Sequence, residues 1–167
     1  MKRFLLRGLA ALALALASIP FVSAQSLTDY AENRLVDAVM RGQSLGAPAT
    51  LYVGLATAAS SCETGSVTEV STSGTAYSRA SVTSNLTNWA GTQSAGSTTA
   101  SSGTGGQTSN NSTITIGSTA TASWGTVTHF FLADASTAGN IWICQALTTS
   151  KTINNGDPAP TFSAGAL

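Results

Sequence analysis

Apolar residues recur at helical spacing in one segment beyond the first two dozen residues of the chain. In residues 26–41 they follow a period of three to four, and the polar residues take the opposite side. Ser26 fits an N-cap with Asp29 three residues later, and Gly42 and Pro48 would end the helix. The pattern predicts one N-terminal amphipathic helix, whose apolar stripe must pack on the following sheet or on a neighbouring subunit.

From residue 50 onward the period of the apolar residues changes to two, which is typical of β-strands. On the longest run, strict alternation places Phe130 and Leu132 on one face and Val127 and Phe131 on the other. Many short strands and one helix predict a mainly β fold, an antiparallel β-sandwich that is jelly-roll-like or closed into a small barrel. Turn signals rich in Gly, Asn and Pro separate the expected strands, which cover residues 50–56, 77–83, 113–117, 121–133, 140–147, 151–154 and 161–166.

Residues 90–112 contain no large apolar side chain and consist mostly of Gly, Ser, Thr and Asn. Such a segment cannot bury enough surface to offset its ordering entropy, so we expect a flexible Gly/Ser/Thr loop. A variable loop that contacts a partner or receptor is the alternative. With this loop included, residues 25–167 have the length of a single domain.

The first 24 residues have the three parts of a secretory signal. Lys2 and Arg3 open it, an uncharged apolar run covers 8–21, and small residues lead to Ala24. That run is shorter than the roughly 20 apolar residues that a membrane span needs, and an uncleaved anchor or a buried arm is the alternative. Cleavage before Gln25 would leave four basic and seven acidic residues, a net charge of −3. The basic residues are scattered, which argues against nucleic-acid binding because phosphate contacts need clustered Lys and Arg.

The sequence contains two cysteines, Cys62 and Cys144. An even number in an exported chain permits a disulfide. It would close a long loop and contribute about 4 kcal/mol in the chain-entropy model. Cys144 also lies in an apolar, strand-like run that suits a buried free thiol. The sequence is compatible with both a disulfide and a buried free thiol.

The titratable residues are too few and too scattered to predict an enzyme. His129 is the single histidine, no G-x-S-x-G elbow is present, and the cysteines have no zinc spacing. We therefore expect no catalytic, metal or cofactor site. Trp124 and Trp142 are expected in the core or at its rim. Trp89 lies beside the central loop and is the candidate for ligand contact, for example by stacking on a sugar.

Three segments resemble the small virion proteins of tailed phages that are known as tail-fibre, head-fibre or minor capsid proteins. The order and spacing of these segments match over most of residues 26–167, outside the central loop. The resemblance implies a non-enzymatic β-sandwich subunit that self-associates on a particle surface with other virion proteins. A contact with a host receptor, such as a surface glycan, is an additional hypothesis. The segments are residues 27–55 (with L-T-D-Y-A-E-N and A-P-A-T-L-Y-V-G-L), 120–130 (A-T-A-S-W-G-T-V-T-H-F) and 139–166 (with G-N-I-W and A-L-T-T-S-K-T-I-N-N-G-D).

A secretory signal does not fit a virion protein, because tailed phages assemble in the cytoplasm. The second interpretation is therefore a secreted cell-surface protein that uses the same sandwich as a structural or glycan-binding, adhesin-like subunit. An intact Met1 in particles would favour the virion. A chain that starts at Gln25 and accompanies envelopes would favour the cell surface.

Overall fold

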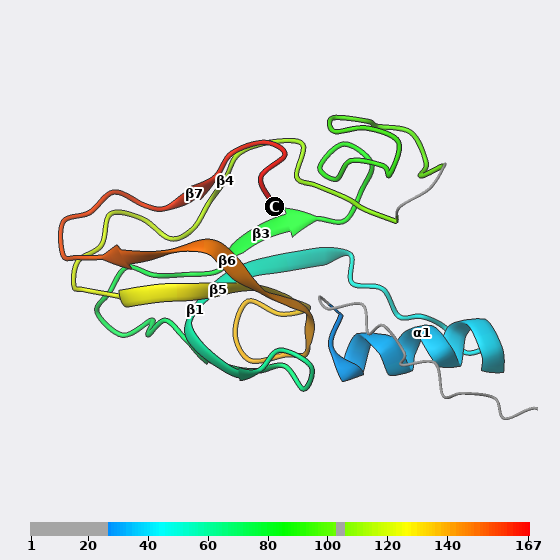
Figure 1. Ribbon diagram of the computed structural model, residues 1–167, viewed down its shortest axis with the longest axis horizontal. Coiled ribbons are helices and arrows are strands. Elements are labelled where there is room, and N and C mark those ends of the chain that lie inside the picture. The colour runs from blue at the N-terminus through cyan, green and yellow to red at the C-terminus, as the bar shows by residue number, and fades with distance from the viewer. Residues whose placement is uncertain (1–26, 103–105) are drawn as a thin grey trace, which may run out of the picture.

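The computed structural model describes residues 27–102 and 106–167. The signal-peptide-like segment 1–24 lies outside these residues. The described chain forms one N-terminal helix and antiparallel strands in two sheets, neither of which closes into a barrel (Figure 1). The mainly β prediction with one N-terminal helix is confirmed, and the barrel alternative is wrong.

The larger sheet is built around β1, which pairs with three other strands. Along one edge β1 pairs with β2 and β3, and along the other it pairs with β5, which in turn pairs with β6. The second sheet consists of β4 and β7 alone. The elements are α1 (Asp29–Arg41), β1 (Thr50–Ser61), β2 (Ser66–Glu69), β3 (Ala80–Thr83), β4 (Ile114–Thr115), β5 (Gly125–Ala133), β6 (Ile141–Ile153) and β7 (Thr161–Phe162).

Three features of the strands differ from the sequence prediction. The strands expected over 140–147 and 151–154 form one continuous strand, β6, because Lys151 and its neighbours still pair with β5. The strand β2 was not predicted. The ladder between β5 and β6 shifts register between Val127 and His129, so strict alternation fails there. As a result Val127 packs in the same core as Leu132 instead of on the opposite face.

The larger core lies between the two sheets, and a smaller one lies on the other face of the large sheet. The smaller core is formed by Ala56, Phe131, Ala133 and Cys144. It requires glycine at position 54, because a Cβ there would lie 2.2 Å from Cζ of Phe131. The larger core contains Val53, Leu55, Val70, Tyr77, Ile114, Ile116, Ala120, Trp124, Val127, Leu132 and Ile153.

The helix α1 begins three residues later than the pattern predicts. Its N-cap is Thr28, whose hydroxyl accepts a hydrogen bond from the amide of Ala31, and Ser26 lies outside the described residues. Gly42 ends the helix in the left-handed conformation with φ of 66°. No helix in the described part of the chain is both long enough and apolar enough to cross a membrane.

The described part of the 90–112 loop is fixed at its base. Trp89 and Asn110 form an isolated antiparallel bridge. Asn110 is 1% exposed, and its side-chain amide donates hydrogen bonds to the carbonyl oxygens of Ser112 and Ser163. This buried amide anchors the loop to the C-terminal segment. The flexibility of the rest of the loop stays a prediction.

Candidate functional site

The helix α1 is attached to the sheet through its first turn. The amide of Thr28 donates to the carbonyl of Trp142 at 3.1 Å, and the Thr28 hydroxyl donates to the carbonyl of Ile141. The ring of Tyr30 packs edge-on against Trp142 with centroids 5.3 Å apart. Ala31 is the buried residue of the helix. Beyond this root, α1 projects away from the sheet (Figure 1).

The last two turns of α1 expose an apolar surface. Leu35, Val36, Val39 and Met40 are 47%, 53%, 71% and 78% exposed, and we call them the helix face. Their spacing of one, three and one residues places them on a single side of a helix. Apolar side chains exposed together in this way are typical of an interaction surface.

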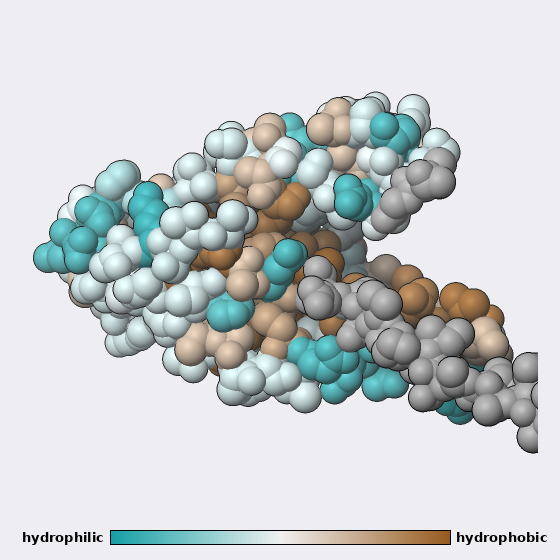
Figure 2. Space-filling view, viewed as in Figure 1, coloured by the Kyte–Doolittle hydropathy of each residue, from teal (hydrophilic) through white to brown (hydrophobic). Residues whose placement is uncertain are grey.

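An apolar groove lies beside the helix. It has a volume of about 530 Å³, and we call it the Trp89 groove. Trp89 is partly buried in its wall, and the indole N–H has no hydrogen-bond partner among the described residues. Figure 2 shows brown, apolar surface on the helix and at the back of the notch that separates the helix from the upper lobe. The groove is lined by Leu51, Ser84, Asn85, Leu86, Trp89, Ala90, Gly91, Ser101, Thr108, Leu132 and Ile143.

A second, polar groove of about 510 Å³ lies between β3 and β4, and we call it the β3–β4 groove. The amide of Ser84 bonds to the carbonyl of Ala49, so the alternating pattern of an antiparallel pair turns the main-chain groups of Ser81 and Thr83 away from β1. The bond from the amide of Ile116 to Pro160 likewise turns those of Thr115 away from β7. These outward groups face the groove from both strands.

Hydroxyl groups dominate the side chains around the β3–β4 groove. Arg79 contributes the single charged side chain among the described lining residues, and its guanidinium is engaged elsewhere. A groove of this composition suits a neutral ligand with many hydroxyl groups. The lining is Ser78, Arg79, Ala80, Ser81, Val82, Thr83, Asn88, Ser112, Thr113, Ile114, Thr115 and Gly117.

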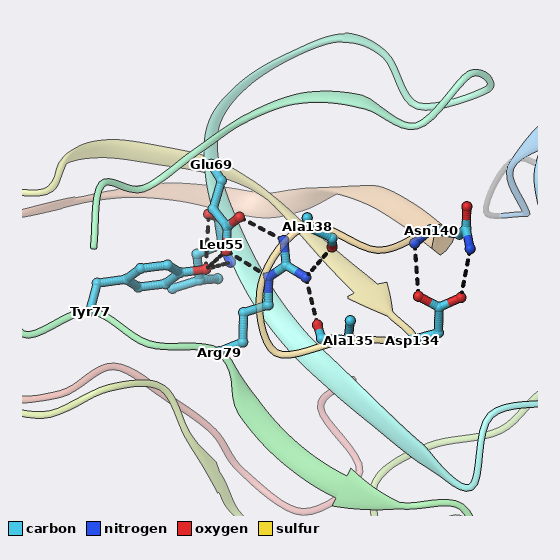
Figure 3. Close-up of polar contacts among 8 residues, drawn as sticks. All are labelled: Leu55, Glu69, Tyr77, Arg79, Asp134, Ala135, Ala138 and Asn140. Atoms are coloured by element: carbon cyan, nitrogen blue, oxygen red, sulfur yellow. Dashed lines mark hydrogen bonds and ion pairs between the residues drawn. The ribbon is translucent and has the colours of Figure 1, made fainter. Parts of the chain in front are cut away.

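Arg79 joins three parts of the chain in a buried polar cluster (Figure 3). Its Nε and Nη2 donate to the two carboxylate oxygens of Glu69 at 2.8 and 2.7 Å. Its Nη1 donates to the carbonyl oxygens of Ala135 and Ala138 at 2.7 and 2.8 Å, which holds the turn after β5. The hydrogen bond to Glu69 raises the pKa of Arg79, although burial opposes it. The cluster ties β2 to the β5–β6 turn and thereby supports the fold.

Tyr77 completes this cluster. Its hydroxyl accepts a hydrogen bond from the buried amide of Leu55 at 2.9 Å and donates to Glu69 Oε1 at 2.8 Å. Burial raises the pKa of Tyr77 far above its ordinary value, and the Glu69 carboxylate adds to the rise. The phenol is therefore a structural hydrogen-bonding group that stays protonated across the physiological range.

Asp134 fixes the other end of the β5–β6 turn (Figure 3). Its carboxylate accepts from the amide of Asn140 at 2.8 Å and from the Asn140 side chain at 2.9 Å. Partial burial on its own would raise the pKa of Asp134, but these hydrogen bonds outweigh it and lower the pKa below 3.8. The carboxylate acts as an acceptor that shapes the turn.

The structure brings both cysteines together at the smaller core. Cys62 follows β1 and Cys144 lies in β6, and their Cα atoms are 5.1 Å apart with the two sulfur atoms bonded. Cys144 is fully buried. The cross-link joins the turn after β1 to β6, the strand that carries the root of α1.

The structure places the other sequence candidates apart from one another. His129 lies in β5 with its Nδ1 2.8 Å from the Thr128 hydroxyl, so the ring is oriented by a hydroxyl instead of a carboxylate. Three acids that are dispersed in sequence do meet, because the turn after β1 lies against the start of α1. The carboxylate oxygens of Asp29, Glu32 and Glu63 lie within 4.8 Å of one another. Two of these acids occupy the first helical turn, where negative charge favours the helix dipole.

Comparison with known proteins gives one family. The model of the family described as Podophage GP4 fiber I protein gp80 matches residues 26–167, which is all of the chain beyond its first 25 residues. No curated protein matches the chain significantly.

Proposed function

Because the chain belongs to the podophage GP4 fiber I protein family, whose members are structural components of the virion, we propose that its copies self-associate into a fibre at the virion surface. The family implies a structural protein and not an enzyme. It also implies assembly with other virion proteins. Self-association and outward exposure are the finer parts of the proposal.

The exposed helix face is the observation that carries self-association. Val39 and Met40 leave more than two thirds of their surface in water, at the C-terminal end of the helix. Burying such side chains stabilises an assembly by about 1.5–3 kcal/mol for each fully buried residue. Several of them in one patch favour association of copies over a free monomer.

Peptide mass spectrometry across a density gradient of phage particles tests whether the protein is part of the virion. We expect its peptides to band with the capsid and the genome. Native mass spectrometry of the purified chain should at the same time give multiples of the subunit mass. A chain that starts at Gln25 and bands with envelopes would instead identify a secreted cell-surface protein, and a chain that remains a monomer would exclude self-association.

We propose in addition that the fibre contacts a neutral glycan of the host through the β3–β4 groove. Its hydroxyl-rich lining, the outward main-chain groups of Ser81 and Thr115 and the amide of Thr83 supply many donors and acceptors for sugar hydroxyls, while the Thr83 carbonyl accepts from Asn88. The amide signals of these residues should shift in NMR spectra when host surface polysaccharide is added. Unchanged amide signals, with signals that shift around Trp89 instead, would move the contact to that tryptophan.

A further inference from the structure

We infer that the Trp89 groove is the docking site for the helix face of a second copy of this chain. The inference rests on the proposed self-association and specifies the surfaces that make it. One chain carries both halves of the contact, a protruding apolar helix and an apolar groove that its own helix leaves open. This self-complementarity is what identifies the occupant as another copy.

The helix cannot direct this face onto its own sheet. Thr28 and Tyr30 attach the opposite side of α1 to β6, which leaves Leu35, Val36, Val39 and Met40 facing outward. Gly42 then ends the helix. The face is therefore presented to a neighbour in a fixed orientation.

The groove matches the helix face in chemistry. Its apolar walls are formed by Leu51, Leu86, Trp89, Leu132 and Ile143, and no described residue that lines it carries a charge. Leu86 is 52% exposed and extends the apolar surface at the groove's edge. The unpaired indole N–H of Trp89 also indicates that the surroundings of this side chain are incomplete in a single copy.

The charges of the helix are compatible with this docking. Arg41 and Asp37 pair at 2.8 Å on the side of α1 away from the helix face, and Arg34 lies over the ring of Tyr30. Asp37 and Arg41 neutralise each other within the helix, so the uncharged groove need not supply a counter-charge for them. The contact therefore joins two uncharged surfaces, the helix face and the Trp89 groove.

The arrangement in space leaves both surfaces open to a neighbour. The helix and the apolar surface at the back of the notch border the same hollow (Figure 2). The helix face of one copy can therefore enter the groove of the next, and the same contact can be repeated from copy to copy.

The test uses a pair of opposite charges in the full chain. Val39→Asp puts a carboxylate into the proposed contact and should raise the association midpoint by about tenfold or more, since a charge in an apolar interface costs at least 1.4 kcal/mol. Leu86→Lys should weaken association similarly. The double variant should recover most of the loss, because the two new charges then face each other. Arg41→Gln makes the same change in net charge on the opposite side of α1 and should leave the midpoint unchanged.

Association is measured by sedimentation velocity over a range of concentrations, and near-ultraviolet circular dichroism verifies that each variant is folded. Met40→Gln is a milder variant that tests the same contact if Val39→Asp fails to fold. Association as strong as that of the wild type in Val39→Asp, Leu86→Lys and Met40→Gln would overturn the inference and leave the proposed self-association intact. Wild-type chains that stay monomeric at every concentration would refute the self-association itself.

Discussion

Replacement of Arg79 by methionine is the most informative perturbation of the fold. The Arg79 side chain is 5% exposed and makes four hydrogen bonds, two to the Glu69 carboxylate and two to main-chain carbonyls of the β5–β6 turn. Its guanidinium also lies 4.9 Å from the centre of the Phe131 ring. Methionine retains most of the packing volume but leaves the carboxylate without its cation.

The size of the effect follows from the exposure of the partner. Breaking a buried pair by removing one member costs about 3–5 kcal/mol. The side chain of Glu69 is 26% exposed and keeps its hydrogen bond from Tyr77, so water and the phenol relieve part of this cost. We expect a loss near the lower limit, about 3 kcal/mol. At roughly 2–4 °C for each kcal/mol, the melting temperature should fall by about 6–12 °C.

Urea unfolding followed by tryptophan fluorescence measures this loss. Lys151→Met is the matched control, because it removes one exposed positive charge without breaking the cluster and should change stability by less than about 0.5 kcal/mol. Addition of Glu69→Gln to Arg79→Met should cost much less than it does in the wild type, since the charge is already unpaired. A loss below about 1 kcal/mol for Arg79→Met would refute this account of the cluster.

Three further changes test other parts of the structure by the same unfolding assay. Tyr77→Phe should cost about 1–3 kcal/mol, because the buried amide of Leu55 loses its acceptor. Because the pKa of Tyr77 is raised in the fold, the unfolded chain loses this proton first and the wild type should lose stability as the pH rises above 10. The phenylalanine variant should lose less stability over the same pH range. Asp134→Asn should be destabilising at neutral pH, and its deficit should shrink as the pH falls below about 4, since the lowered pKa of Asp134 stabilises the fold only while the carboxylate is ionised. The double variant Cys62→Ser and Cys144→Ser should lose about 4 kcal/mol, and a reducing agent should have the same effect on the wild type alone.

Local periodicity is what made the main elements predictable. The helical spacing of residues 26–41 and the alternation around Val53 and Leu55 depend on neighbours in sequence, and both produced the expected elements. The buried position of Trp124 also followed from its place in the strand expected over 121–133. These features require no knowledge of which segments meet in space.

Features that depend on contacts between distant segments of the chain could not be predicted from the sequence. The bulge beyond Val127 is set by the pairing of β5 with β6, and the polar run in β6 remains a strand because β5 continues beside it. Trp89 was identified as a contact residue, but its apolar neighbours Leu51 and Ile143 come from distant parts of the chain. The sugar contact of Trp89 was inferred from its aromatic side chain at the edge of the loop and stays a prediction, whereas the apolar groove around it could not be seen in the sequence.

The distribution of the few charges connects the fold to its assembly. Three of the four basic residues beyond position 25 are engaged inside their own chain, Arg34 over Tyr30, Arg41 with Asp37 and Arg79 in the buried cluster. The helix face and the described lining of the Trp89 groove contain no charged residue, so salt has little to screen at these two surfaces. Uncharged contacts have little selectivity except through shape, so selectivity must come from how rigidly α1 is held. Thr28 lies in neither the helix face nor the lining of the Trp89 groove, yet its hydrogen bonds to β6 set the angle at which α1 leaves the sheet, and with it the geometry of the proposed contact.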